Sequence, residues 1–308
     1  MTAQVAIVGM GTMGPGMAAT MARAGLAVRC YDTSDAARER ILPDTATAAT
    51  VLDRIHGGPA QTPGQVTVHT SLPEAVTDAE LVIESVPENL DVKAAVFADL
   101  EKHAPADAIL TTNTSGIPVS TIAAPLRNPA RVAGMHWSNP PHIIPVVEVI
   151  AGEQTSAQTT EAVRALVIEL GLKPIRVLKD VPGFVENRVL YAIMRECLSL
   201  VDSGVATAED LDACVQWGIG FKLSVIPPLQ LLDVAGLDIY HAVASYLNRD
   251  LDRRSDVSPA ITERVDAGHL GMKTGEGMFG YTPEQAAELR AARARALVAV
   301  RQAITQQR

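Results

Sequence analysis

The sequence predicts an α/β fold, in which a Rossmann-type, mostly parallel sheet is followed by an all-helical C-terminal domain. The first half alternates short β-like runs with helical patterns, which is typical of a parallel sheet covered by helices. Beyond Asp180–Gly183, a break that contains both a proline and a glycine, the pattern becomes almost wholly helical. We therefore expect one domain over residues 1–181 and a helical domain over residues 182–308.

Each element is predicted from its hydrophobic run and the breaks around it. Strands are expected over Gln4–Val8, Ala27–Tyr31, Gln65–His69, Leu81–Ser85, Ile109–Thr112, Val132–His136, Val146–Ile150 and Pro174–Leu178. Helices are expected over Met13–Ala24, Val92–Lys102, Ala157–Leu170, Val185–Asp202, Ala208–Trp217, Pro228–Leu251 and Pro283–Gln307.

Composition limits the class of protein. The chain has 308 residues, 47% of them hydrophobic and 20% charged, which is ordinary for a globular enzyme. The net charge of -9 argues against a nucleic-acid partner. Three cysteines without CxxC spacing favour reduced thiols, and no apolar run approaches the ~20 residues of a membrane span. We expect a soluble, cytoplasmic protein that acts on a small molecule and has no membrane partner.

The first predicted strand leads into a glycine-rich loop and then a helix, which is the dinucleotide-binding pattern. Gly9 permits the tight turn, Gly11 lets the backbone approach the pyrophosphate, and Gly14 lets the helix pack close to the strand. Asp32 ends the second strand, where a carboxylate binds ribose hydroxyls and repels a 2′-phosphate, so NAD is favoured over NADP. The predicted cofactor-binding residues here are Gly9, Gly11, Thr12, Met13, Gly14 and Asp32.

His136 and Glu148 form the candidate catalytic pair. A hydride leaves carbon more easily when a base takes the hydroxyl proton, and histidine has a suitable pKa for that role. A carboxylate on the other ring nitrogen would fix the tautomer. Prolines between the two residues predict a turn that joins two neighbouring strands. A buried structural histidine with a surface glutamate is the alternative interpretation.

Six motifs, in order, resemble those of the 3-hydroxyacyl-CoA dehydrogenase family along essentially the whole chain. They are Gly9–Gly16, Val82–Asn89, Asn113–Ser115, the His136 and Glu148 pair, Asp180–Arg188 and Lys273–Gly277. The resemblance implies that His136 is the general base with Glu148 as its partner, and that the helical second domain completes the site and builds a homodimer.

The resemblance also implies roles for further polar residues. Ser115 and Asn187 would position the substrate oxygen. Glu88, Lys93, Asn113, Ser115 and Lys273 would contribute to the cofactor site. Each also has an ordinary structural interpretation, such as a solvated helix charge for Lys93 or backbone bonding in a turn for Ser115.

The segment Thr33–Gln65 departs from the family pattern. Members that act on acyl-CoA carry a lysine-bearing helical insertion after the second strand, whereas this segment contains no lysine. A phosphate-rich ligand needs positive partners, so a coenzyme A site is in doubt. Met135–His142 instead resembles a small branch of the family that oxidises a pyridine-carboxylate aldehyde to the acid in vitamin B6 breakdown.

That resemblance predicts a coherent site. An aldehyde gives up a hydride only after water adds to it, and His136 would activate that water. Trp137 would stack on the aromatic substrate, and Arg188 and Arg195 would bind its carboxylate. No metal site is predicted. The main alternative is an L-3-hydroxyacyl-CoA dehydrogenase, with a 3-hydroxyisobutyrate-type dehydrogenase or a non-catalytic NAD-binding protein ranked lower.

Overall fold

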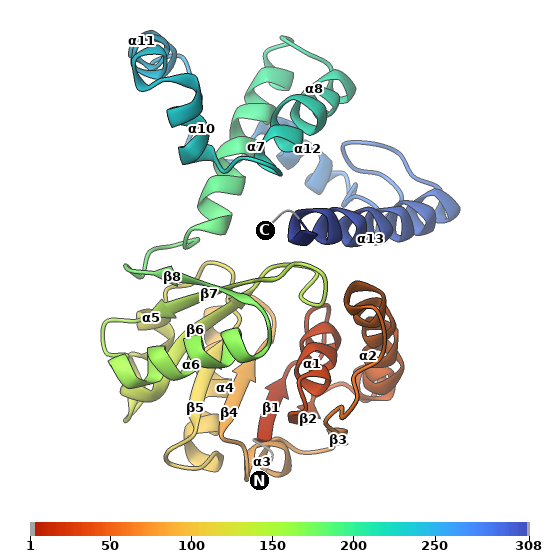
Figure 1. Cartoon of the computed structure of the whole chain (residues 1–308), viewed down its shortest axis with the longest axis vertical. Coiled ribbons are helices and arrows are strands. Elements are labelled where there is room, and N and C mark those ends of the chain that lie inside the picture. Colours follow the sequence, from red (N-terminus) through yellow and green to blue (C-terminus); the bar gives the residue numbers. More distant parts are fainter. Residues whose placement is uncertain (1–3, 307–308) are drawn as a thin grey trace. The chain divides into compact units, whose positions relative to one another are not determined.

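The computed structural model describes residues 4–306, which form two compact units that divide after Arg188. The first unit is built on an eight-stranded sheet (Figure 1). Its strands are β1 (Gln4–Val8), β2 (Ala27–Tyr31), β3 (Val66–His69), β4 (Leu81–Glu84), β5 (Ile109–Thr112), β6 (Val132–Trp137), β7 (Val146–Ala151) and β8 (Lys173–Val177). The predicted strands are thus confirmed, with ends shifted by at most one residue.

The strand order is β3-β2-β1-β4-β5-β6-β7-β8, and its β3-to-β6 part is the order of a dinucleotide-binding sheet. Neighbouring strands are parallel except β6 and β7, which are antiparallel. The carboxyl ends of β1, β2, β4, β5 and β6 therefore share one edge, and β7 begins at that edge. This edge is where a ligand site is expected.

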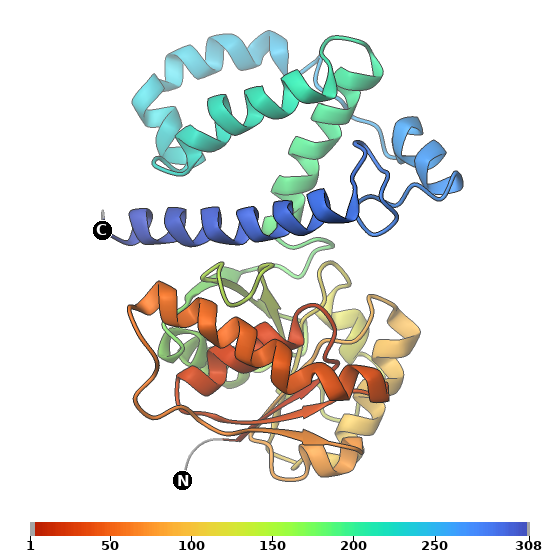
Figure 2. The ribbon, with the colours of Figure 1, turned by 90° about the vertical axis from the view of Figure 1, so that its right-hand side faces the viewer.

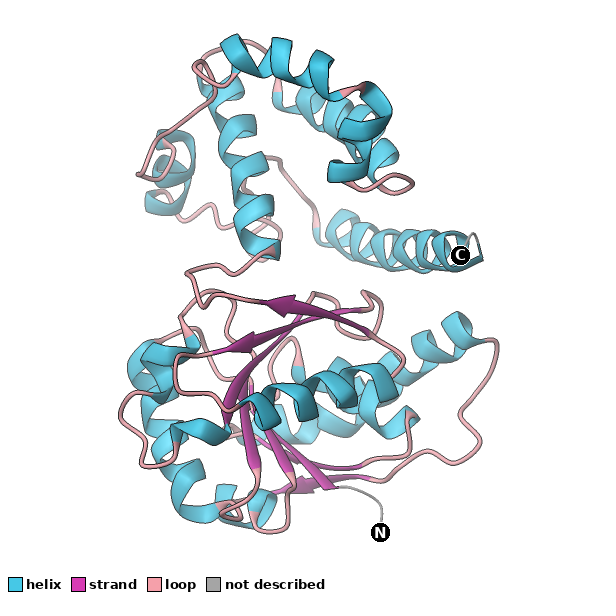
Figure 3. Cartoon of the chain, turned by 60° about the vertical axis from the view of Figure 1, so that its left-hand side comes forward, coloured by secondary structure: helices cyan, strands magenta, loops and turns pink. Residues whose placement is uncertain are grey.

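Helices cover both faces of this sheet (Figure 3). They are α1 (Gly14–Arg23), α2 (Asp35–His56), α3 (Leu72–Val76), α4 (Leu90–His103), α5 (Val119–Ala123), the 3₁₀ turn η1 (Pro129–Arg131) and α6 (Ala157–Glu169). Alternate residues of β1 point to opposite faces: Val5 and Ile7 pack with α1 and α6, whereas Ala6 and Val8 pack with α3, α4 and α5. Because both faces are buried, the strands read as continuous apolar runs.

The long helix α2 lies against α1 (Figure 2). Ser34 caps its first turn by accepting a hydrogen bond from the Ala37 N–H group, and Gly57, at φ +74°, ends it in the left-handed conformation. The contact with α1 rests on Ala19, Ala48 and Leu52. No helix was assigned to this segment from the sequence, because its alanines and threonines give a weak apolar stripe.

The second unit is helical, as predicted. It holds most of α7 (Glu186–Asp202), then α8 (Ala208–Cys214), the π-helical turn η2 (Val215–Gly220), α9 (Phe221–Leu223), α10 (Pro228–Ala235), α11 (Leu237–Leu247), α12 (Pro259–Asp266) and α13 (Pro283–Gln306). The predicted single helix over Pro228–Leu251 is wrong: it is two helices, α10 and α11, separated by Gly236 at φ +97°. No helix within residues 4–306 is long and apolar enough to cross a membrane.

Candidate active site

His136 and Glu148 face each other across the antiparallel pair of strands β6 and β7. The two residues are direct partners in the register, as the predicted turn between them requires. His136 Nδ1 donates a hydrogen bond of 2.8 Å to Glu148 Oε2, and both side chains are buried. The other oxygen, Oε1, accepts from the N–H groups of Val185 at 2.9 Å and Glu186 at 3.1 Å.

These hydrogen bonds determine the charge of Glu148. Burial opposes its ionisation, but the bonds from His136, Val185 and Glu186 favour the carboxylate more strongly, and the pKa of Glu148 lies below its usual value. An ionised carboxylate can only accept hydrogen bonds, so the proton of the neutral imidazole is held on Nδ1. The second nitrogen, Nε2, is thereby left free to accept a proton.

A tight turn that leads into α7 positions both N–H groups. Gly183 has φ +76° and Phe184 has φ +48°, a conformation that a bulky residue rarely adopts. The buried ring of Phe184 lies against His136, with ring centroids 6.0 Å apart. Strain of this kind persists only when the surroundings enforce it, and it often marks functional sites. Here the turn directs the N–H groups of Val185 and Glu186 at the Glu148 carboxylate.

Glu186, the first residue of α7, brings a second carboxylate to the pair. Its Oε1 accepts a hydrogen bond of 2.6 Å from the hydroxyl of Ser138. A ring nitrogen of His136 and one carboxylate oxygen each of Glu148 and Glu186 lie within 4.8 Å of one another. Three such groups can hold a metal ion, but both oxygens of Glu148 already accept hydrogen bonds. Sequence reasoning missed Glu186, although it stands inside the recognised Asp180–Arg188 motif.

Ser115 and Asn187 are brought together at the same edge. The Asn187 side-chain amide donates a hydrogen bond of 2.7 Å to the backbone carbonyl of Ser115. Ser115 is exposed, and its N–H group donates to Glu88 Oε1 at 2.9 Å. Asn113 instead joins strand ends: its side chain accepts from the Trp137 N–H group and donates to the Ser85 hydroxyl. Its predicted contact with the cofactor stays a prediction.

The glycine-rich loop fits a dinucleotide. Gly9 has φ +96°, and a Cβ atom there would lie 2.5 Å from the carbonyl oxygen of Ser85, so no other residue fits. A Cβ atom on Gly11 would have no neighbour within 4 Å, which leaves open space for the pyrophosphate. Helix α1 begins at Gly14 without a side-chain cap, so its first N–H groups are available to phosphate oxygens. Thr12 is exposed and Met13 is half-buried beside this opening.

Asp32 lies immediately after β2, as predicted. Its Oδ2 accepts a hydrogen bond of 2.8 Å from the Met10 N–H group, and its Oδ1 accepts one of 2.9 Å from Ser34. The carboxylate is therefore held beside the glycine-rich loop. This placement fits a group that binds the ribose hydroxyls of NAD.

Lys93 and Glu88 belong to a network that also contains Glu84. Lys93 is 1% exposed, and its Nζ contacts Glu84 Oε1 at 2.8 Å and Glu88 Oε2 at 3.4 Å. Glu84 is fully buried and also accepts from the Thr112 hydroxyl at 2.7 Å. Lys93 is therefore a buried partner of Glu84 and not a solvated helix charge. Sequence reasoning missed Glu84, because an acid that follows three apolar residues at the end of a strand gives no signal that it is buried.

Glu88 is the exposed member of this network. Its Oε1 accepts from the Thr114 hydroxyl and from the N–H groups of Ser115 and Gly116. Partial burial opposes ionisation of Glu88, but these bonds and the Lys93 charge prevail, and its pKa is lowered. The carboxylate thus holds the turn that carries Ser115.

The predicted substrate contacts have different outcomes. Trp137 is 1% exposed and packs in the core beside α1 and α6, so the structure gives no open ring face for stacking. This corrects the prediction that Trp137 stacks on the aromatic substrate. The reason is the alternation along β6, which turns His136 and Trp137 to opposite faces. Arg188 is exposed near the site. Arg195 and Lys273 belong to the second unit, and their roles stay predictions.

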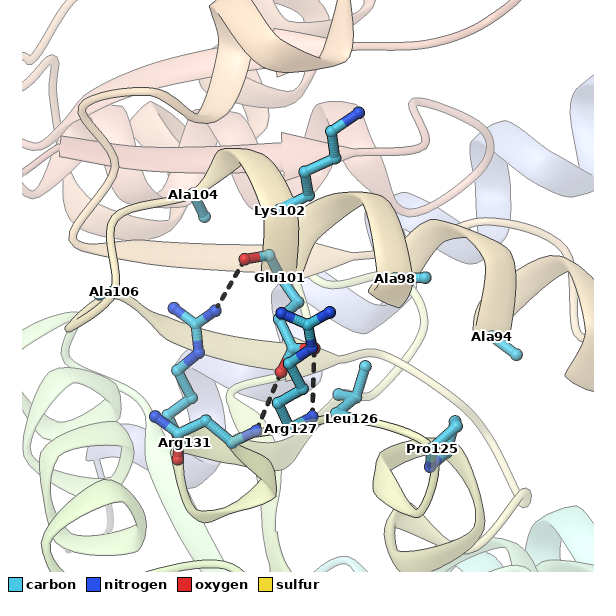
Figure 4. Close-up of a pocket in the computed structure, with 11 residues that line it drawn as sticks. Ala94, Ala98, Glu101, Lys102, Ala104, Ala106, Pro125, Leu126, Arg127 and Arg131 are labelled. Carbon is cyan, nitrogen blue, oxygen red and sulfur yellow. Dashed lines mark hydrogen bonds between the residues drawn. The ribbon is translucent and has the colours of Figure 1, made fainter.

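A separate groove of about 820 Å³ lies at the opposite edge of the sheet (Figure 4). It is formed where the chain enters β5 and β6, among Glu101, Arg127 and Arg131. Glu101 accepts hydrogen bonds from the N–H groups of Arg127 and Asn128, and the Arg131 guanidinium donates to the carbonyl groups of Pro105 and Ala108. These contacts close the ends of helices and loops. Ligands of such sheets bind at the carboxyl ends of the strands, so this groove is not the candidate site.

Two family models match the chain. The NAD-binding domain of 3-hydroxyacyl-CoA dehydrogenase matches residues 4–181, and the C-terminal domain of 3-hydroxyacyl-CoA dehydrogenase matches residues 183–281. The 5-formyl-3-hydroxy-2-methylpyridine 4-carboxylate 5-dehydrogenase of Mesorhizobium japonicum is 53% identical over 98% of each chain. A probable 3-hydroxybutyryl-CoA dehydrogenase of Bacillus subtilis is 36% identical over 90% of this chain and 97% of its own.

Solved structures show the same two likenesses. A crystal structure of a 5-formyl-3-hydroxy-2-methylpyridine 4-carboxylic acid 5-dehydrogenase, described as an NAD⁺-dependent dismutase, has a TM-score of 0.96 and 52% identity over 99% of each chain. A (S)-3-hydroxybutyryl-CoA dehydrogenase of Ralstonia eutropha has a TM-score of 0.73 and 33% identity, covering 92% of this chain and 100% of its own.

Proposed function

Because the chain belongs to the 3-hydroxyacyl-CoA dehydrogenase family and is an NAD-dependent dehydrogenase, we propose that it oxidises a pyridine-carboxylate aldehyde to the acid. The observation that carries the reaction type is the buried pair of His136 and Glu148, hydrogen-bonded at 2.8 Å. The substrate class is supported by the 53% identity with the Mesorhizobium enzyme over nearly the whole chain. The same pair also serves aldehyde reduction, so dismutation of two aldehyde molecules is part of the proposal.

The pair activates water in this proposal. Glu148 holds the proton of His136 on Nδ1, so Nε2 accepts a proton from water as it adds to the aldehyde, or from the resulting hydrate. Glu148 then stabilises the imidazolium that forms. The chemistry that NAD supplies when bound is the acceptance of a hydride. Histidine suits the proton transfer because its usual pKa of about 6.5 lies near the working pH.

Thiol chemistry is a weaker explanation of aldehyde oxidation here. Cys30 lies in β2, where burial raises the pKa of its thiol to about 12, so the reactive thiolate is disfavoured. Burial is also the main cause that raises the pKa of the Cys197 thiol. The water route through His136 therefore has better support than a thiohemiacetal.

Polar groups around Ser115 are the proposed substrate contacts. Ser115 and Asn187 are already joined by a hydrogen bond and would position the reacting oxygen. Arg188 lies one residue beyond Asn187 and is exposed, which suits a partner for the substrate carboxylate. Arg195 is proposed as a second partner of the substrate carboxylate.

Helix α2 disfavours coenzyme A as a ligand. It carries four carboxylates against three arginines and no lysine. Arg38 is already engaged by Asp35 and by the Asp32 carbonyl group. The phosphates of coenzyme A require concentrated positive charge, which this helix does not offer. The acyl-CoA alternative is correspondingly less supported.

A homodimer in the cytoplasm is a further part of the proposal. Helices α10 and α11 contain no buried residue, although Leu229, Val234 and Tyr246 on them are large and apolar. Such faces are normally covered by a partner, and a second copy fits the family. Light scattering after gel filtration should give twice 32.6 kDa, whereas a monomer mass would reject the dimer. Free cysteines favour the reducing cytoplasm.

The test of function compares two substrates. Purified protein and NAD are mixed with 5-formyl-3-hydroxy-2-methylpyridine 4-carboxylate or with 3-hydroxybutyryl-CoA, and NADH is followed by absorbance. We expect NADH from the aldehyde alone. Turnover of the acyl-CoA alone would replace the proposal by alcohol oxidation. The variant His136→Gln should bind NADH normally but lose turnover, and retained turnover would reject His136 as the base.

A further inference from the structure

Glu186 is a carboxylate beside the candidate base that none of the roles above uses. One of its oxygens, Oε1, accepts from the Ser138 hydroxyl at 2.6 Å. The other, Oε2, is buried and accepts no hydrogen bond from the described part of the chain. Its carboxylate lies within 4.8 Å of both His136 and Glu148.

A buried oxygen of this kind requires a donor. An unsatisfied buried acceptor is costly, and the penalty is larger for an ionised group. The Glu186 N–H group is fixed to Glu148, so α7 holds the carboxylate in place at the His136 side of the site. A hydroxyl of the bound substrate, near the atom that His136 deprotonates, can supply that donor.

On its reacting carbon, the proposed substrate offers such a donor only in its hydrated form. A hydrated aldehyde carries two hydroxyl groups on the reacting carbon, whereas a secondary alcohol carries one and a free aldehyde carries none. A ring nitrogen of His136 and a carboxylate oxygen of Glu186 lie within 4.8 Å of each other, so two hydroxyls of one carbon can reach both residues with hydrogen bonds of about 2.7–2.8 Å. We propose that Glu186 accepts a hydrogen bond from the second hydroxyl of the hydrate and so selects the hydrate for oxidation. This inference rests on the proposed aldehyde oxidation.

The step balances without a further reactant. Water adds to the aldehyde to give the geminal diol. His136 takes the proton of the first hydroxyl, the electron pair of that O–H bond forms the new C=O bond, and the carbon loses its hydrogen as a hydride to NAD. The second hydroxyl keeps its proton, bonded to Glu186, and becomes the hydroxyl of the carboxylic acid. The products are the acid, NADH and one proton on His136.

The reverse type of step does not need Glu186. When the free aldehyde is reduced to the alcohol, its single oxygen receives a proton from the His136 imidazolium. No second hydroxyl is present, so the Glu186 carboxylate has no donor to bind. A change at Glu186 should therefore separate oxidation from reduction, which a merely structural role would not do.

The variant Glu186→Gln tests this role in the full-length protein. Oxidation of 5-formyl-3-hydroxy-2-methylpyridine 4-carboxylate with NAD and its reduction with NADH are measured separately, and the acid and alcohol are quantified by chromatography. We expect kcat/KM for oxidation to fall on the order of 10- to 100-fold, because a charged acceptor is lost. Reduction should stay within about threefold of the wild-type value. Glu169→Gln, at the exposed end of α6, removes the same charge away from the site and should change neither rate.

Three outcomes would overturn the inference. If the wild-type protein oxidises only 3-hydroxybutyryl-CoA, the proposed function and the hydrate role fail together. If the wild-type protein oxidises the aldehyde but Glu186→Gln lowers oxidation and reduction equally, the function stands and Glu186 is structural. The same conclusion follows if both directions fall together with the melting temperature or with NADH affinity.

Discussion

The substitution Glu148→Gln tests the central pair most directly, because it changes one oxygen of a buried side chain to an NH₂ group. The wild-type carboxylate accepts three hydrogen bonds, at 2.8 Å from His136, 2.9 Å from Val185 and 3.1 Å from Glu186. Glutamine has only one accepting oxygen. If that oxygen stays with the two backbone N–H groups, the NH₂ group faces Nδ1 of His136.

The histidine must then change its tautomer. An NH₂ group facing Nδ1 requires Nδ1 to accept, which moves the imidazole proton to Nε2, the nitrogen that should take the substrate proton. In the opposite orientation the NH₂ group would face two N–H donors and lose both bonds, at about 1–3 kcal/mol each. The first orientation is therefore favoured. A wrong tautomer of a catalytic histidine reduces kcat by up to ~10⁴-fold.

We expect kcat of Glu148→Gln to fall by about 10³- to 10⁴-fold, with NAD affinity unchanged. The folded state should lose only about 1–2 kcal/mol, because the two backbone bonds remain. The rate is measured by NADH absorbance, affinity by fluorescence titration, and the tautomer by ¹⁵N NMR of the ring. A kcat within tenfold of wild type, with the proton still on Nδ1, would refute this reasoning. Glu169→Gln serves as the control.

Three further predictions concern the glycine-rich loop and the acidic residues of the site. Lys93→Met leaves the fully buried Glu84 without its cation, so the free energy of unfolding in urea should fall by about 3–5 kcal/mol; a loss below about 1 kcal/mol would contradict a paired Glu84. Gly9→Ala places a Cβ atom 2.5 Å from the Ser85 carbonyl oxygen at φ +96°, so NAD affinity by titration should fall at least tenfold, and normal affinity would reject the loop geometry. The pKa values of Glu88 and Glu148 are lowered on folding, so their stabilisation is complete above about pH 4.5 and is lost as pH falls through the lower folded pKa values; a melting temperature constant down to about pH 3 would oppose this.

The sheet was predictable because its strands carry a strong local signal. Each is a short apolar run between breaks, and the buried faces of a parallel sheet demand such runs. The pairing of His136 with Glu148 followed from the prolines between them and from the geometry of a returning strand. Helix α2 gave a weaker signal, and the break at Gly236 requires a positive φ that the surrounding apolar pattern conceals.

Parts of the site could not be predicted from the local sequence pattern. Glu84 looks like the end of an apolar strand, and only the fold brings Lys93 within 2.8 Å of it. Glu186 looks like an ordinary first-turn acid of a helix until β6 places Ser138 against it. Trp137 was assigned to the substrate by its neighbourhood in sequence, whereas the alternation of β6 turns it into the core. Long-range contacts place Glu84 and Glu186, and strand alternation places Trp137.

The reversed direction of β7 has a consequence for how this active site can change. Because β7 runs antiparallel to β6, it delivers its first residues, and not its last, to the ligand edge, which is why Glu148 is the third residue of β7. The base and its partner are therefore held by the hydrogen bonds between β6 and β7, close to the ligand edge of the sheet. The turn around Phe184 and the start of α7 lie outside these two strands. Side chains there can change without altering the strand pairing of His136 and Glu148, as long as the turn still directs the N–H groups of Val185 and Glu186 at Glu148.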